Sequence, residues 1–286
     1  MKKSLSVTEI KIRRFCRNVS VKILSDKVAT EAPLEIVLAH GESSSRRQKS
    51  ISITMRTPGD ADFDLVLGFL FSEGIINSSK DVSSVKYTAN AGFDESLQYN
   101  TVRVDLYASI KPDLQRLERH FYTSSSCGVC GKASVDLVRQ QSSFYPHKDF
   151  PVVEAEVLYN LPQLIRSAQS VFEDTGGLHA SALFDSKGQL LCLREDVGRH
   201  NALDKLIGWA LRSEMMPLKD CILMLSGRIS FELVQKASMA GIPIIAAIGA
   251  PSSLAVELAS ESNITLVGFL RENRMNVYCG EDRIRS

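Results

Sequence analysis

Hydrophobic and polar positions alternate over short runs in the first half of the chain, and this pattern predicts β-strands. The candidate strands are residues 34–39, 51–55 and 97–106. Between them, apolar residues recur at helical spacing over residues 62–73, and Gly74 follows as a helix stop. The polar residues 89–95 predict a hairpin loop, and residues 132–140 predict a further helix. We therefore expect a strand-rich first half.

The second half has a more regular pattern, in which predicted helices and strands alternate. An amphipathic helix at residues 158–172 ends at Gly176 and Gly177, and an antiparallel hairpin of two strands, 178–184 and 189–193, follows it. The later elements are a helix at 201–211, a strand at 221–225, a helix at 230–240, a strand at 242–248, a helix at 252–260 and a strand at 264–270. Such alternation is typical of βαβ units and a parallel sheet.

The length of 286 residues and the 44% of hydrophobic residues allow one large or two smaller domains. Residues 144–151 hold two prolines and mark the best boundary. Residues 1–27 carry eight Lys or Arg against Glu9 and Asp26, which is typical of a frayed basic tail. We expect a basic tail at 1–29, a strand-rich domain at 30–150 that ends in a cysteine-containing loop, and an α/β domain at 151–286.

Charge and cysteine usage narrow the class of protein. The formal charge of +1 argues against bulk attraction to nucleic acid, and no apolar run approaches the ~20 residues of a membrane span. The basic start is not followed by the apolar stretch of a secretory signal. Cys192 and Cys221 lie in apolar runs and are expected in the core, so the cysteines do not form a disulfide framework. We expect a cytoplasmic protein.

Cys127 and Cys130 form the one close cysteine pair. In residues 123–131, six of the nine positions are Ser, Thr or Gly, which disfavour regular structure and bury little apolar surface. We therefore expect both thiols on an exposed loop, where they can meet a partner outside the chain.

Three chemistries are open to this pair. A zinc site normally needs four ligands, and the next cysteine is 62 residues further along in a buried strand. A thioredoxin-like dithiol needs the pair to follow a strand and open a helix, which the Ser-rich approach does not match. A persulfide carrier needs an exposed thiolate on a mobile arm, and the loop context fits this third interpretation best.

Three strand-to-helix junctions share glycine, a capping Ser or Asn and, in two cases, arginine. They are residues 198–201 with Arg199 and His200, residues 226–230 with Arg228, and residues 249–253. Free N–H groups at helix starts bind anions, and the junctions of an open α/β sheet gather at the carboxyl edge of its strands. The alternative is that these residues are ordinary helix caps.

The last strand delivers two more guanidinium groups to the same edge, Arg271 and Arg274, on either side of Glu272 and Asn273. The chain has neither a GxxxxGK[ST] nor a GxGxxG motif, so ATP- or NAD-type binding is not indicated. His179 and His200 are ordinary packed or capping residues on one interpretation. On the other, a protonated imidazole near the cysteines lowers a thiol pKa.

Several motifs resemble the formate dehydrogenase accessory sulfurtransferase family, called FdhD. They are residues 123–134 around the cysteine pair, 55–60 (MRTPGD), 67–74 (LGFLFSEG), 176–180 (GGLHA), 195–205 (EDVGRHNALDK), 226–230 (SGRIS) and 249–255 (GAPSSLA). The resemblance runs from about residue 30 to the end of the chain, in one order and without a departure at the cysteines.

The resemblance implies a sulfur relay, in which the protein is a sulfurtransferase that acts as a persulfide carrier and cofactor chaperone. A cysteine desulfurase passes a persulfide sulfur to Cys127, with Cys130 as a helper or second carrier. The sulfur then goes to the molybdenum (or tungsten) bis-guanine-dinucleotide cofactor destined for the formate dehydrogenase catalytic subunit. Relatives suggest a homodimer. The family's cofactor contacts correspond here to Phe269, Leu270, Arg271, Glu272, Asn273 and Arg274.

The resemblance also implies a fold of class α/β, with a C-terminal cytidine-deaminase-like α/β/α domain and a smaller strand-rich N-terminal α+β domain. Deaminases place zinc ligands at two helix starts with an H-x-E motif. The junctions here, at 179–181, 199–201 and 226–228, contain no cysteine, so no metal site is expected. A cofactor-binding chaperone without sulfur transfer is the competing function, and a zinc-dependent deaminase is a distant third.

Overall fold

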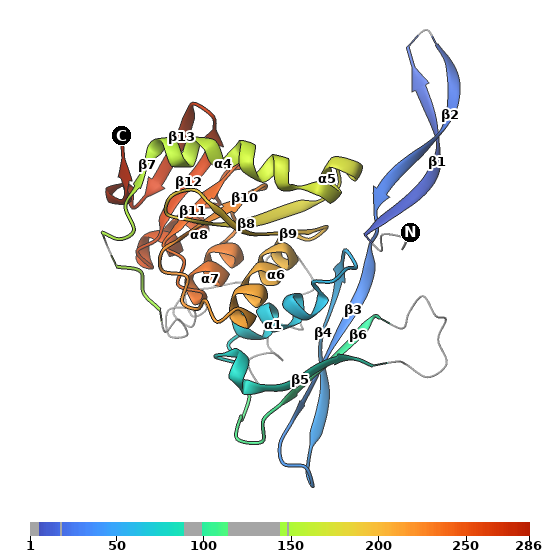
Figure 1. Ribbon diagram of the computed structural model, residues 1–286, viewed down its shortest axis with the longest axis vertical. Helices are drawn as coiled ribbons and strands as arrows, with labels where there is room; N and C mark the ends of the chain where they lie inside the picture. The colour runs from blue at the N-terminus through green and yellow to red at the C-terminus, as the bar shows by residue number, and fades with distance from the viewer. Residues whose placement is uncertain (1–5, 18, 89–98, 114–143, 148) are drawn as a thin grey trace.

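The computed structural model describes residues 6–17, 19–88, 99–113, 144–147 and 149–286. Its class is mixed α/β, and the chain runs from an N-terminal hairpin through a small sheet to a large helix-covered sheet (Figure 1). Among these residues, no helix is both long and apolar enough to cross a membrane.

The large sheet has six strands in the order β13-β12-β11-β10-β8-β9. They are β8 (His179–Asp185), β9 (Leu190–Asp196), β10 (Cys221–Leu225), β11 (Ile244–Ala247), β12 (Thr265–Arg271) and β13 (Arg274–Cys279). Strands β10, β11 and β12 are parallel, and β8 pairs antiparallel with both β9 and β10. The predicted parallel strands and the predicted hairpin are therefore confirmed.

Helices cover both faces of this sheet, because each strand alternates its side chains between the two faces. One face packs against α4 (Ala155–Ala168), and the other packs against α6 (Arg199–Arg212), α7 (Phe231–Met239) and α8 (Ser253–Glu261). In β10, Ile222 and Met224 face α4, while Leu223 and Leu225 lie in the opposite cluster. The predicted helix 158–172 is interrupted at Gln169, and α5 (Ser170–Thr175) follows. The specific likeness to cytidine deaminases stays a prediction.

A four-stranded sheet in the order β4-β3-β6-β5 forms the first half. Its strands are β3 (Ala32–His40), β4 (Arg47–Arg56), β5 (Val82–Tyr87) and β6 (Thr101–Leu106), and α1 (Asp62–Ser72) follows β4. Strands β3 and β6 are parallel neighbours, whereas β4 and β5 pair antiparallel at the edges. Strand β5 was not predicted, since its run of Val, Ser and Lys gives only a weak alternation.

Helices α1 and α6 join the two halves at backbone contact. A Cβ atom on Gly68 would lie 1.9 Å from the carbonyl oxygen of Asp204, and one on Gly208 would lie 1.8 Å from that of Asp64. Only glycine permits this approach. One hydrophobic core includes residues of both halves, so the two halves pack as one body. The division at residue 150 stays a prediction.

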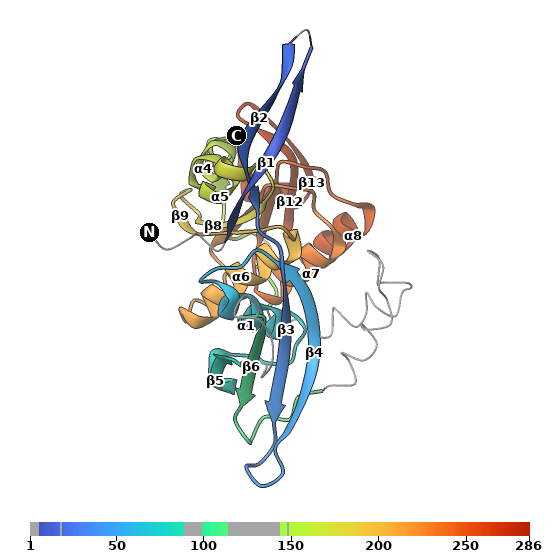
Figure 2. The ribbon, with the colours of Figure 1, turned by 90° about the vertical axis from the view of Figure 1, so that its right-hand side faces the viewer.

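The N-terminal segment differs from the expected frayed tail. Strands β1 (Val7–Cys16) and β2 (Val19–Ala29) form an antiparallel hairpin that extends away from the body in both views (Figures 1 and 2). The reason is the alternation of Ile10 and Ile12 with charged residues, which pairs Ile12 with Leu24 across the strands. Because the segment is so basic, it was predicted as a tail, and this two-residue alternation was not read as a pair of strands. Two short strands, β7 (Val153–Glu154) and β14 (Ile284–Arg285), tie the end of the chain to the start of α4.

Candidate functional site

The predicted cysteine pair, Cys127 and Cys130, lies outside the described residues, as do the predicted loop 89–95 and the helix 132–140. Among the described cysteines, Cys192 and Cys221 are buried, which confirms the prediction that they are core residues. Burial raises the pKa of each of these two thiols to about 11. Neither thiol is therefore suited to nucleophilic chemistry at neutral pH.

The carboxyl ends of β10 and β11 are locked together by backbone hydrogen bonds. The N–H of Gly249 donates to the carbonyl of Gly227 at 2.9 Å, and the N–H of Phe269 donates to the carbonyl of Gly249 at 3.1 Å. A Cβ atom on Gly249 would lie 2.9 Å from the backbone nitrogen of Arg228, so the close approach requires glycine there. The junctions 226–230 and 249–253 are thus brought side by side, as the topology predicted.

His200 connects the third junction to the other two. Its Nε2 lies 3.2 Å from Ser230 Oγ and 2.8 Å from a carboxylate oxygen of Glu232 at the start of α7. The hydrogen bond from His200 is the largest cause of the lowered pKa of Glu232. His200 is therefore held in place by α7, and all three predicted junctions meet at one edge of the sheet.

Arg199 and Arg228 meet at this edge without a hydrogen-bonding or ion-pairing partner among the described residues. The Nε of Arg199 is buried with no hydrogen-bond acceptor there. The nearby carboxylate of Asp196 is already occupied, because Lys205 Nζ lies 2.6 Å away and the N–H groups of Thr57 and Gly198 donate to it. Unpaired guanidinium groups around a helix start are an arrangement that binds anions.

His179, at the first position of β8, faces the same arginines. Its ring packs on Gly227, where a Cβ atom would lie 3.2 Å from Nδ1. Burial lowers the pKa of His179, and the charges of Arg199, His200 and Arg228 lower it further. The sequence alone did not predict His179 as part of the anion site. Its closeness to Gly227 of the neighbouring junction follows only from the pairing of β8 with β10.

The second predicted group lies on the turn between β12 and β13. Arg271 Nη1 donates to the carbonyl of Ile248 at 2.9 Å, which anchors this turn to the end of β11. Arg271, Glu272, Asn273 and Arg274, with Pro162, line an open depression of about 540 Å³. Phe269 is partly exposed and Leu270 is buried in the core facing α4. Arg274 lines this depression, whereas Arg199 and Arg228 do not.

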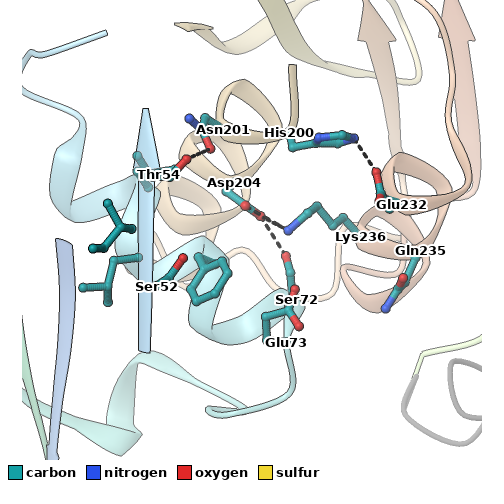
Figure 3. A pocket seen from close by; sticks show the side chains of 14 residues that line it. Ser52, Thr54, Ser72, Glu73, His200, Asn201, Asp204, Glu232, Gln235 and Lys236 are labelled. Carbon is teal, nitrogen blue, oxygen red and sulfur yellow. Dashed lines mark hydrogen bonds and ion pairs between the residues drawn. The ribbon is translucent and has the colours of Figure 1, made fainter. Parts of the chain in front are cut away.

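A second polar cavity, of about 310 Å³, lies between β4 and the helices α1, α6 and α7, and His200 and Glu232 are among its lining residues (Figure 3). Lys236 Nζ lies 2.8 Å from both carboxylate oxygens of Asp204, and Ser72 Oγ donates to Asp204 at 3.0 Å. Burial acts to lower the pKa of Lys236, but Asp204 and Glu73 outweigh it and the pKa is raised. This cluster is an internally satisfied link between α1, α6 and α7.

The described part of the chain contains no group of three or more His, Cys, Asp or Glu residues placed to hold a metal ion. The fold and the described residues define an α/β protein with cationic side chains gathered at the carboxyl edge of its sheet.

Comparison with known sequences identifies the family. The sequence model of the FdhD/NarQ family matches residues 29–285, so the chain belongs to this family and the resemblance is confirmed. A sulfur carrier protein FdhD of Mycolicibacterium paratuberculosis is 52% identical over 260 residues, which are 91% of this chain and 92% of the relative. One of Saccharolobus solfataricus is 43% identical over 260 residues, 91% of each chain.

A solved structure has the same fold. It is a putative formate dehydrogenase accessory protein from Desulfotalea psychrophila, with a TM-score of 0.72 and 22% identity, and the alignment covers 98% of this chain and 99% of that one.

Proposed function

We propose that the protein is a sulfurtransferase that carries persulfide sulfur from a cysteine desulfurase to a molybdenum (or tungsten) bis-guanine-dinucleotide cofactor during maturation of formate dehydrogenase. Relatives about half identical over nine-tenths of the chain are named sulfur carrier proteins, which supports the sulfur-carrying role. The cofactor is the substrate of this transfer and not a resident group.

In the proposed first step, the Cys127 thiolate attacks the terminal sulfur of the desulfurase persulfide. The sulfur–sulfur bond of that persulfide breaks, the desulfurase recovers its thiolate, and Cys127 becomes the persulfide. Cys130, directly after the intervening Gly128 and Val129, is the helper or second carrier. When the Cys127 persulfide gives up its terminal sulfur, the sulfur–sulfur bond breaks and its electron pair stays on Cys127 as the thiolate, so the reduced metal of the substrate supplies the two electrons that convert the transferred sulfur atom to sulfide.

The observation that carries the cofactor proposal is that Arg199 and Arg228 lie at the carboxyl edge of the sheet without a hydrogen-bonding or ion-pairing partner among the described residues, and that Arg199 Nε is buried there. Each guanine dinucleotide carries a pyrophosphate, and planar guanidinium groups suit phosphate oxygens. We assign the phosphates to Arg199, Arg228 and the adjacent His200, and the remaining contacts to residues 269–274, of which 271–274 line the neighbouring depression. Two copies of the chain, as a homodimer, are the proposed assembly.

Mass spectrometry tests the sulfur-carrying role. Incubation with a desulfurase and cysteine should add ~32 Da, one sulfur atom, which dithiothreitol removes by thiol exchange. The Cys127→Ser variant should lose this adduct, while Cys16→Ser, which removes an exposed cysteine of the hairpin, should keep it. An unchanged adduct yield in Cys127→Ser sinks the assignment. The alternative function is a cofactor chaperone without sulfur transfer, which needs only the anion site. This alternative predicts full maturation of formate dehydrogenase with Cys127→Ala.

A further inference from the structure

A cavity of about 460 Å³ lies next to the anion site, between α4 and α5 on one side and the carboxyl edge of the sheet on the other. Gly176, Gly177 and His179 are among its lining residues, together with Ser226 and Ile248 at the ends of β10 and β11. Pro162 belongs to this cavity and to the depression beside Arg271 and Arg274. The cavity therefore lies between the two groups of arginines that the proposed function uses.

One polar side chain of this cavity has an unmet hydrogen bond. Gln169, in the break between α4 and α5, is 5% exposed, and its amide nitrogen has no acceptor among the described residues. A buried donor without an acceptor costs about 1–3 kcal/mol. The Nε of Arg199 is likewise buried without an acceptor in the described part of the chain, so this region offers two donors to an acceptor-rich ligand.

His179 is the titratable group between these donors. The groups that face it are Arg199 and His200 from α6, Arg228 from the loop after β10, and Asp196 from β9. Only Asp196 favours the imidazolium, and its charge is shared with Lys205. Arg166 of α4, over the ring of Phe172 at 5.6 Å, adds another positive charge to the cavity lining. Because His179 is partly buried and surrounded by cations, its pKa is lowered and the neutral form is favoured at neutral pH.

We propose that His179 is an additional ligand residue of the anion site, which contacts a phosphate group in this cavity and takes up one proton when that group binds. The proposal rests on the proposed cofactor site and assigns it a residue and a protonation step. A phosphate beside the ring supplies the negative charge that Asp196 does not, so it stabilises the imidazolium that the arginines disfavour. The proton comes from the buffer, and the imidazolium then donates to a phosphate oxygen.

The coupling has a defined sign. A site that gains one proton on binding loses affinity as pH rises, by up to about tenfold per pH unit between the pKa of His179 in the free protein and its pKa in the complex. Below both pKa values the imidazole is already protonated and the dependence disappears.

Calorimetry of the full chain tests the proposal with two probes, guanosine diphosphate and inorganic pyrophosphate. Titrations near pH 7 in two buffers of different ionisation enthalpy give the number of protons taken up. The parent should take up a fraction of a proton more than His179→Gln, which remains able to donate one hydrogen bond. Because the ligand's own phosphate protonation is the same for both proteins, the difference belongs to His179. His40→Gln, at the far end of β3, is the matched control and should equal the parent.

Equal proton uptake by parent and His179→Gln, with binding intact, overturns this proposal and leaves the proposed function standing. Failure of both probes to bind the parent overturns both. If pyrophosphate shows the His179-dependent uptake as fully as the nucleotide does, the phosphates alone account for the coupling. If only guanosine diphosphate shows it, the cavity also requires the nucleoside.

Discussion

Lys236 of α7 holds Asp204 of α6 by two hydrogen bonds of 2.8 Å, and both side chains are buried. Ser72 of α1 adds a third bond to the same carboxylate. Because α6 carries Arg199 and His200 and α7 follows the junction with Arg228, this pair fixes the two junctions of the anion site relative to each other (Figure 3).

Asp204→Ala should lower the free energy of unfolding by about 3–5 kcal/mol, because it leaves a buried ammonium without its counter-charge. The double variant Asp204→Leu/Lys236→Met should recover much of this loss, since no charge remains buried. Urea denaturation measures both. The exposed pair Lys27–Asp174, at 2.9 Å, is the control, and its disruption should leave the free energy of unfolding nearly unchanged because solvent screens both charges. A small loss for Asp204→Ala would contradict the role given to the pair.

Gly208→Ala should be among the most destabilising single-methyl changes in this chain. The added carbon would lie 1.8 Å from the carbonyl oxygen of Asp64, so α1 and α6 must move apart, at a cost of about 3 kcal/mol or more. Gly177→Ala is the matched control, because its nearest neighbour is an ordinary 3.6 Å away. Thermal unfolding compares the two, and equal melting temperatures would show that the helices can separate freely.

Cys192 and Cys221 should resist alkylation in the folded protein, whereas the exposed Cys16 should react. Burial raises the pKa of both core thiols to about 11, so the reactive thiolate is scarce at pH 8. Each folded-state pKa lies above the ordinary thiol pKa of 9.0 that applies in the unfolded chain, so the associated stability is complete below pH 9 and is lost as pH rises toward 11. Peptide mapping after iodoacetamide treatment checks the first point. Modification of either core thiol at the rate of Cys16 would contradict it.

Arg228→Ala should weaken guanosine diphosphate binding by ~1.5–3 kcal/mol, the loss of a charge-assisted bond to phosphate. Arg47→Ala removes an exposed guanidinium from β4, away from the site, and should leave the affinity unchanged. Calorimetry measures both dissociation constants. Equal affinity in Arg228→Ala and the parent would mean that the junctions serve only as helix caps.

Local periodicity was sufficient for much of the second half. Strand 221–225 was predicted with the bounds that β10 has, and the hairpin of β8 and β9 lies where the turn residues place it. These elements are set by neighbours along the chain: buried parallel strands are continuously apolar and turns need Gly or Asp. The predicted order of strands and helices also places Arg199 and Arg228 at the same edge of the sheet.

The site was predictable only in part, for a physical reason. Whether His179 is charged depends on Arg199 and Arg228, which are 20 and 49 positions away and reach it through the pairing of β8 with β9 and β10. The amide nitrogen of Gln169 and the Nε of Arg199 are buried without an acceptor among the described residues. This lack of an acceptor likewise becomes apparent only from the three-dimensional positions of their neighbours. Cys127 and Cys130 remain a prediction of the sequence and the family.

What the sequence determined by itself is the family, the parallel α/β core and the junctions that carry the arginines, because these follow from residue type and spacing along the chain. What only the tertiary structure decided is the N-terminal hairpin, the backbone contact of Gly68 and Gly208 with the opposite helix, and the electrostatic setting of His179. Each of these depends on distances between residues far apart in the chain, and burial and charge act through those distances and not through the order of residues.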